Sequence, residues 1–99
     1  MKHRTAFLLI LIPLAAQAED HRVIQKGRRF TPTEIAVKAG DSLTFSNDDE
    51  FIHQMYSDGL FDSDEMKPGQ TLTQAFSRTG TFEVRCHIHP KMKLLVHIN

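Results

Sequence analysis

The sequence predicts an all-β fold, either a two-sheet sandwich or a small barrel of about seven short strands. Two observations lead to this prediction. Apolar residues alternate with polar ones over short segments, and turn-forming residues recur about one strand length apart. In addition, the chain has no long helical period, internal repeat or low-complexity segment. We therefore expect little helix outside the N-terminal segment, whose composition differs from the rest.

The first 18 of the 99 residues have the layout of a secretory signal peptide. A basic start at Lys2 and Arg4 leads into the apolar block Ala6–Ala16, and a small-x-small pattern of the kind that signal peptidase recognises ends at Ala18. The apolar block has only 11 residues and contains Pro13, whereas a membrane-spanning helix needs about 20. We therefore expect cleavage after Ala18 and export to the periplasm or beyond, without a remaining membrane anchor.

The predicted mature domain, residues 19–99, is small and nearly neutral. Without Lys2 and Arg4, 10 basic residues stand against 12 acidic ones, which gives a formal charge of −2. This balance argues against nucleic acid or an anionic membrane as a partner. A domain of 81 residues has a small core, and its single cysteine, Cys86, cannot form an intrachain disulfide. A bound metal is therefore the remaining way to reinforce the fold.

Alternating segments follow one another along the mature chain. Ile35 and Val37, then the turn Lys38–Asp41, then Leu43 and Phe45, predict a β-hairpin. Alternation or neighbouring turns also predict strands at Arg22–Lys26, His53–Ser57, Gln70–Ser77, Thr81–Cys86 and 94–98.

The segment with chemical potential follows the strand that ends at Cys86. Cys86, His89 and Met92 place a thiol, an imidazole and a thioether at positions i, i+3 and i+6, between two predicted strands. A loop of this length can bring all three side chains onto one ion. His53 is the best candidate for a fourth donor, because it opens a predicted strand after the polar turn Asn47–Glu50 and can come from a neighbouring strand.

This donor set favours copper over other metals. One thiolate and two imidazoles with a weak, long methionine bond is the arrangement of copper electron-transfer sites. A structural zinc site normally has more cysteines or closes all four positions with Cys and His. One copper ion that cycles between Cu(I) and Cu(II) is therefore the expected cofactor. His87 is a competing imidazole, but neighbouring side chains on an extended chain point to opposite faces, so we favour His89 as the ligand.

Together these motifs resemble the cupredoxins of the plastocyanin, pseudoazurin and amicyanin group. The short gap between His89 and Met92 is most like that of amicyanin. The matching segments cover nearly all of the mature chain and occur in the family's order: residues 30–47, residues 48–53, Pro68-Gly69, Gly80–Phe82 and the Cys-x-x-His-Pro-x-Met loop. One departure is Gln54, at a position where these proteins usually carry an asparagine that helps to fix the copper loop.

The resemblance implies a Greek-key sandwich in which His53, Cys86 and His89 bind copper and Met92 is the axial ligand. It also implies a blue copper protein that carries single electrons between larger redox proteins, such as a cytochrome or a dehydrogenase. We expect a monomer that meets these partners through a weak contact at the exposed edge of His89. Pro90, with Phe51 or Ile52, is expected to belong to that contact.

The sequence is compatible with other functions besides electron transfer. The same fold and site would allow copper handling, by sequestration or delivery, and His87, Met55 and Met66 favour this alternative as additional donors. A third possibility is an exported β-sandwich that binds other proteins without metal. Catalysis is not expected, because the sequence contains no Ser/His/Asp set, paired carboxylates or phosphate loop. Taken singly, Met55 and Met66 are gap-filling core side chains and Asp48–Glu50 is a solvated turn.

Overall fold

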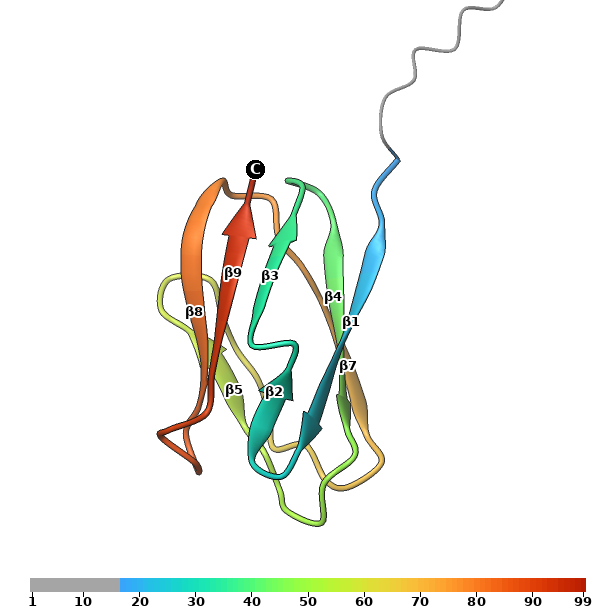
Figure 1. The fold of residues 1–99 in the computed structure, drawn as a ribbon, viewed down its shortest axis with the longest axis vertical. Coiled ribbons are helices and arrows are strands. Elements are labelled where there is room, and N and C mark those ends of the chain that lie inside the picture. Colours follow the sequence, from blue (N-terminus) through green and yellow to red (C-terminus); the bar gives the residue numbers. More distant parts are fainter. Residues whose placement is uncertain (1–16) are drawn as a thin grey trace, which may run out of the picture.

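Nine short strands form two sheets that face each other in the computed structural model, which describes residues 17–99 (Figure 1). The predicted signal peptide, including Lys2, Arg4 and the block Ala6–Ala16, lies outside the described residues except for its last two positions. No helix occurs within residues 17–99, and so none that could cross a membrane. The strands are β1 (Asp20–Lys26), β2 (Arg29–Thr31), β3 (Glu34–Val37), β4 (Ser42–Asn47), β5 (Met55–Ser57), β6 (Phe61–Asp62), β7 (Thr71–Ala75), β8 (Gly80–Cys86) and β9 (Lys93–Ile98).

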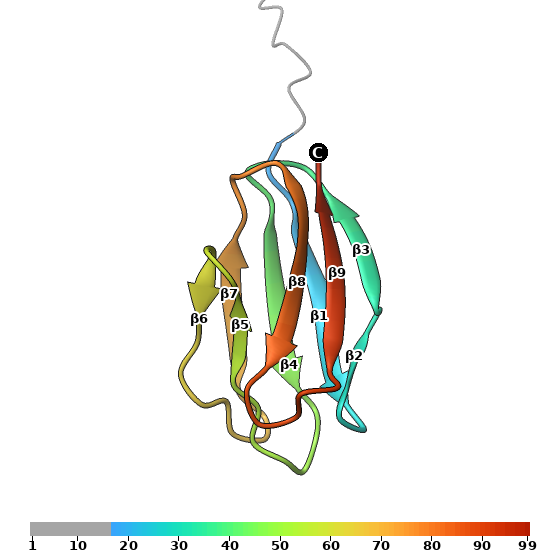
Figure 2. The same ribbon diagram turned by 90° about the vertical axis from the view of Figure 1, so that its left-hand side faces the viewer.

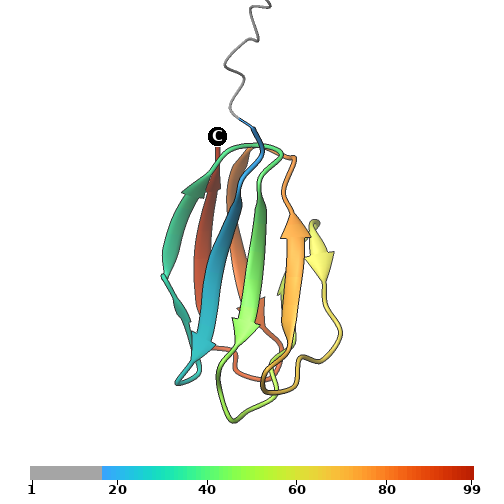
Figure 3. The same cartoon turned by 90° about the vertical axis from the view of Figure 1, so that its right-hand side faces the viewer.

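One sheet has the strand order β2-β1-β4-β7 and the other β3-β9-β8-β5-β6. Figure 2 shows the second sheet nearest the viewer, and Figure 3 shows β1, β4 and β7 side by side in front of β8 and β9. Each sheet contains one parallel pair, β1 with β4 and β3 with β9, among antiparallel ones. The predicted two-sheet sandwich is therefore confirmed. The strand count exceeds the expected seven because the sequence prediction lacks β2, which pairs with β1, and the two-residue strand β6, which pairs with β5.

The core lies between the two sheets because side chains alternate in direction along each strand. Leu43 and Phe45 of β4 and Leu94 and Val96 of β9 belong to one core cluster, and all four are fully buried. Each such side chain contributes about 1.5–3 kcal/mol by leaving water. The same alternation places Cys86 on the buried face of β8, together with Val84, so the chain delivers its only thiol to the end of the core.

The predicted hairpin around Lys38–Asp41 is wrong. β3 pairs with β9 in one sheet, whereas β4 pairs with β1 and β7 in the other, so this turn carries the chain from one sheet to the other. Val37 and Leu43 are both buried, one from each side of the core. Alternation indicates which face of a strand is buried. The pattern is the same whether two strands pair within one sheet or face each other from different sheets. The sequence pattern therefore could not separate these arrangements.

Several connections gather at one end of the sandwich, the lower end in Figure 1. They include the β1–β2 turn at Gly27-Arg28, the β4–β5 connection, the β6–β7 connection and the β8–β9 loop. Gly27 and Arg28 have φ angles of +63° and +56°, as a two-residue type I′ turn requires. The C-terminus and the β3–β4 turn lie at the opposite end. A rigid sandwich that presents loops at one end is a common setting for a functional site.

Candidate metal centre

Strand pairing brings His53 next to Cys86. Cys86 ends β8 and lies opposite Met55, the first residue of β5, and His53 precedes Met55 by two positions. His53 is held there by an isolated bridge to Met66, in which each backbone N–H donates to the other residue's carbonyl at 3.0 and 2.6 Å. As predicted, His53 reaches this end of the sandwich from a strand that neighbours the cysteine strand.

The structure brings three of the four predicted donors together. The Cys86 Sγ atom lies 3.8 Å from His53 Nδ1 and 3.7 Å from His89 Nδ1, and the two Nδ1 atoms are 3.2 Å apart. A metal at about 2.0 Å from nitrogen and about 2.3 Å from sulfur, with bond angles near 120°, would place such donors about 3.5–3.7 Å apart. The cluster therefore has the size of a single ion's coordination plane. No other group of three His, Cys, Asp or Glu donors is this close within residues 17–99.

Met92, the fourth predicted donor, lies at the far end of the same loop and is buried. Its backbone N–H donates to the carbonyl of His89 at 2.9 Å, which closes a tight turn between the imidazole and the thioether. Pro90 inside this turn limits the conformations that the loop can adopt. Ligation by Met92, like the whole ligand assignment, stays a prediction.

A buried carboxylate determines which nitrogen of His53 can bind a metal. One oxygen of Asp49 lies 2.9 Å from His53 Nε2, so a protonated Nε2 donates to it and Nδ1 keeps its lone pair for the cluster. Burial alone would raise the pKa of Asp49, but the backbone N–H groups of Arg28 and Gly27 and the ring of His53 outweigh it and hold that pKa below its ordinary value. Asp49 is therefore an anion at neutral pH.

Asp49 corrects one sequence interpretation. The sequence predicts a solvated turn at Asp48–Glu50, and this holds for Asp48 and Glu50, which are exposed, but Asp49 is buried. Two features of the sequence could have indicated the role of Asp49. It lies four residues before His53, and it belongs to a polar turn that leads directly to the site. Asn47, also buried, fixes the turn, because its Oδ1 accepts the N–H of Asp49 and its Nδ2 donates to the carbonyls of Phe51 and Met66.

The backbone at Gln54 supports the thiol. The N–H of Gln54 donates to Cys86 Sγ at 3.4 Å, a contact that stabilises negative charge on sulfur. The side chain of Gln54, the departure from the family pattern, donates to the carbonyl of Ser63 at 3.1 Å. In addition, the N–H of His87 donates to the carbonyl of Gln54 at 2.8 Å. The backbone of this residue thus ties the His53 segment to the Cys86 loop whichever amide side chain it carries.

His87 faces away from the cluster, as alternation predicted. Its ring stacks on Tyr56 with centroids 4.0 Å apart and an interplanar angle of 15°, and its Nε2 lies 3.0 Å from a carboxylate oxygen of Asp62. Met55 and Met66 are buried core residues, and the amide of the buried Gln25 contacts their sulfur atoms.

His89 closes the cluster on the solvent side. Desolvation first, and then the neighbouring His53 and Arg28, lower the pKa of His89, while Asp49 opposes them. A neutral imidazole with a free lone pair is therefore favoured at neutral pH, as metal binding needs. The ring of Phe51 meets that of His89 edge to face, with centroids 5.9 Å apart, and the exposed large hydrophobic residues within residues 17–99, Phe51, Ile52 and Ile88, belong to the connections around it.

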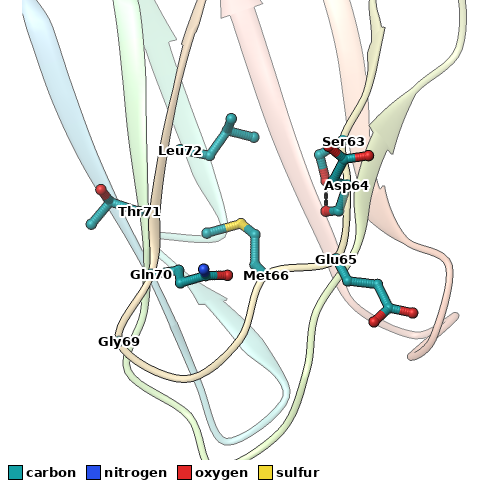
Figure 4. A pocket seen from close by; sticks show the side chains of 8 residues that line it. All are labelled: Ser63, Asp64, Glu65, Met66, Gly69, Gln70, Thr71 and Leu72. Atoms are coloured by element: carbon teal, nitrogen blue, oxygen red, sulfur yellow. Dashed lines mark hydrogen bonds between the residues drawn. The ribbon is translucent and has the colours of Figure 1, made fainter.

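A separate hollow of about 550 Å³ lies along the segment that joins β6 to β7. Figure 4 shows Met66 pointing inward between the strands while Glu65 points away. The residues that line this hollow are Ser63, Asp64, Glu65, Met66, Gly69, Gln70, Thr71 and Leu72. None of them is a histidine or a cysteine, so this hollow does not extend the metal centre.

Comparison with known proteins agrees with the fold. A family model described as a cupredoxin-like domain matches residues 3–96. Methylamine utilization protein MauL of Methylorubrum extorquens is 29% identical over 93 residues, which cover 90% of this chain and 82% of that protein.

Two solved structures show the same fold. A purple cupredoxin from Nitrosopumilus maritimus superposes with a TM-score of 0.75 at 22% identity, over 81% of this chain and all of that one. A Cu(I) amicyanin variant gives a TM-score of 0.76 at 23% identity, over 81% of this chain and 82% of its own.

Proposed function

We propose that this chain, which belongs to the cupredoxin-like family, is a type I (blue) copper protein. It carries single electrons between larger redox proteins. The family fold and the His-Cys-His cluster support a single copper ion as the cofactor. The observation that carries the proposal is the convergence of Cys86 Sγ with the Nδ1 atoms of His53 and His89 within 4.8 Å. We assign these three residues as ligands in a plane and Met92 as the weak axial ligand.

The surroundings of the cluster suit electron transfer. Copper, when bound, supplies the one-electron chemistry, and the chain supplies donors that are held in place. Asp49 orients His53, the N–H of Gln54 supports Cys86, and the turn closed by Met92 positions His89. Donors that are fixed in this way need little movement when the charge on the metal changes by one. A site with little rearrangement exchanges electrons quickly.

The exposed side of His89 is the proposed route for the electron. Cys86 and His53 are buried, whereas His89 is partly exposed, and the exposed Phe51, Ile52 and Ile88 belong to the two connections that carry His53 and His89. This apolar surface fits brief contacts with a redox partner such as a cytochrome or a dehydrogenase, because small interfaces of this kind release their partner readily. We expect no catalytic turnover of a substrate at this site.

Export is part of the proposal. Residues 1–18 act as the signal peptide and residues 19–99 form the copper-binding domain in the periplasm. The start of β1 at Asp20, two residues after the proposed cleavage site, supports this boundary, because removing residues 1–18 leaves every strand intact.

Copper handling receives little support from the structure. The donors that favoured it lie elsewhere, since His87 binds Tyr56 and Asp62 while Met55 and Met66 pack in the core beside Gln25. None of the three extends the cluster on its solvent side, where a delivery route would need donors.

The reduction potential and the electron self-exchange rate of the copper-loaded protein test the proposal. An intense visible absorption, reversible voltammetry and fast self-exchange are expected of a carrier. Copper that leaves quickly for a chelator, together with slow or irreversible cycling, would instead indicate copper handling. A colourless protein with no redox response would contradict both functions.

A further inference from the structure

A basic groove borders the exposed side of His89. This hollow of about 580 Å³ lies between the β1–β2 turn and the β8–β9 loop. Ile88, Pro90 and Met92 contribute apolar surface to it, and Arg28, Arg29 and Lys91 supply positive charge. A second hollow next to it, of about 240 Å³, shares both arginines and adds Lys93. Together these two hollows, which we call the groove, combine an apolar lining with four cations beside the proposed electron route.

The charge in this groove is local and unneutralised. No ion pair within residues 17–99 involves Arg28, Arg29, Lys91 or Lys93. The mature domain as a whole has a formal charge of −2, so these cations are not the sign of a generally basic protein. The exposed carboxylates of Asp48 and Glu50, in the β4–β5 connection, do not line either hollow.

Arg28 is held in place by two contacts. Its backbone, at a φ of +56°, donates its N–H to Asp49 at 2.8 Å, and its guanidinium lies 4.2 Å from the centre of the Phe51 ring. The ring of Phe51 in turn contacts that of His89. Only the ring of Phe51 therefore separates the fixed positive charge of Arg28 from His89, the proposed electron exit.

We propose that this groove docks a protein partner that presents carboxylates around its own redox centre. The proposal rests on the proposed function as an electron carrier and adds the chemistry of the partner. Complementary charge steers two proteins into a productive encounter and increases the association rate while leaving the complex short-lived. The four cations orient the partner, and the apolar surface at Ile88 and Pro90 excludes water from the contact.

Electron transfer with small probes of opposite charge tests the surface. The Cu(I) protein is oxidised in a stopped-flow instrument by hexacyanoferrate(III), which becomes hexacyanoferrate(II), or by tris(phenanthroline)cobalt(III), which becomes the cobalt(II) complex. We expect the rate with the anion to fall with increasing salt. Reversing charge in Arg29→Glu with Lys91→Glu should lower the rate with the anion by roughly tenfold at low salt and raise that with the cation. Lys91→Glu alone should give a smaller change in the same direction.

Lys38→Glu is the matched control, because Lys38 is exposed and belongs to the β3–β4 turn at the opposite end. It changes the net charge in the same direction as each groove substitution and should leave both rates nearly unchanged. Equal effects of Lys38→Glu and Lys91→Glu, or no effect of the groove variants, would overturn the docking proposal. Failure of the proposed function is separate, since a protein without blue colour or reversible reduction would show it before any comparison of probes.

At the opposite end of the sandwich, the carboxylate of Asp41 has three nitrogen partners within hydrogen-bond distance. Asp41 is only 4% exposed, and it accepts hydrogen bonds from the backbone N–H groups of Glu19 and Lys38, each at 2.9 Å, while His21 Nε2 also lies at 2.9 Å. The backbone N–H groups of Glu19 and Lys38, and then His21, lower the pKa of Asp41 to about 2. Glu19 is fixed further by the N–H of Ser42, which donates to its carbonyl at 2.9 Å.

We infer that Asp41 is the binding site for the N-terminus that signal-peptide cleavage creates. Hydrolysis of the Ala18–Glu19 bond adds OH to the Ala18 carbonyl and H to the Glu19 nitrogen, which then becomes an α-ammonium. That nitrogen already lies 2.9 Å from the Asp41 carboxylate, so cleavage replaces a hydrogen bond from an uncharged amide with an ion pair without moving the chain. Asp41 lines a hollow whose other polar or charged residues are Gln17, which cleavage removes, and Glu19, His21, Lys38 and Asn99.

Chains that start at Glu19 or at Ala18 distinguish the ion pair from the amide contact. The ion pair raises the α-amino pKa, so its stabilisation is present below the ordinary value of about 7.7–8.0 and is lost as the pH rises through the raised value. At pH 6.5 the chain from Glu19 should melt about 4 °C higher than the chain from Ala18, and the difference should vanish near pH 10.5 and with Asp41→Asn. Equal melting temperatures at pH 6.5, or a mass of the exported protein that excludes Glu19 as its first residue, would overturn the inference.

Discussion

The Nε2 atom of His53 lies 2.9 Å from a carboxylate oxygen of Asp49, and both side chains are buried. The same carboxylate accepts the backbone N–H groups of Gly27 and Arg28 at 2.8 Å. One acidic residue therefore orients a proposed copper ligand and holds the turn that presents Arg28 beside His89. Changes at Asp49 should affect the metal centre although Asp49 is not a ligand.

Asp49→Asn should weaken copper binding about 10–100-fold, as loss of a carboxylate partner to a metal-binding histidine typically does. The side-chain oxygen of asparagine can still accept an N–H group, but its NH₂ group cannot accept one and faces a donor instead. The asparagine therefore no longer fixes the tautomer of His53. Competition with a chelator of known affinity measures the change. Asp48→Asn is the control, because Asp48 is exposed and accepts only from Ser46. Similar affinities for the two variants would contradict the role assigned to Asp49.

Cys86→Ser should abolish the intense visible absorption of the copper form, because that absorption arises from charge transfer between thiolate and copper. Optical spectra of the two copper-loaded proteins make the comparison. Unfolding curves of the metal-free proteins provide a check, since Cys86 is also a core residue. A serine variant with undiminished colour would exclude Cys86 as the thiolate ligand.

Met92→Leu should retain copper and colour but raise the reduction potential. The axial thioether is the weakest bond of such a site, and its electron density favours Cu(II), so removing it favours Cu(I). Leucine fills a similar volume in the buried position of Met92, which keeps the loop packed. Voltammetry of both proteins reports the shift. A lower potential in the variant would argue against Met92 as the axial ligand.

His89→Ala and His87→Ala should behave differently. Loss of His89 removes an equatorial imidazole and opens the cluster to water, so copper affinity should fall in both oxidation states and the colour should change. His87 faces Tyr56 and Asp62, and its removal should leave spectrum and affinity nearly unchanged. Copper retention and visible spectra of the two variants decide the matter. Bleaching of the His87 variant alone would reverse the assignment.

Acid should weaken the fold through Asp41. Its pKa is lowered to about 2 from an ordinary 3.8, so the unfolded chain takes up the proton first as the pH falls. The contribution of Asp41 to stability is therefore present above about pH 4 and is lost as the pH falls through about 2. Thermal unfolding of the metal-free protein between pH 5 and pH 2 should show a shallower dependence on pH in Asp41→Asn. Parallel curves for the two proteins would contradict this assignment.

Much of the fold could be predicted because burial alternates along the strands. The buried faces of β4, β8 and β9 follow directly from Leu43 and Phe45, from Val84 and Cys86, and from the apolar residues of 94–98. Sheet membership could not be predicted in the same way. The turn Lys38–Asp41 has the composition of a hairpin turn, yet it joins two strands that face each other across the core.

The sequence by itself determined the kinds of donor and their order, because Cys86, His89 and Met92 lie within one loop whose length can bring them together. It also indicated that His87 points away, since neighbouring side chains alternate. Only the tertiary structure decided how His53, 33 residues from Cys86, comes within 3.8 Å of its sulfur, and that Asp49 is buried while Asp48 and Glu50 are not. Strand pairing sets contacts between distant residues, and the local pattern of a strand does not specify its partner.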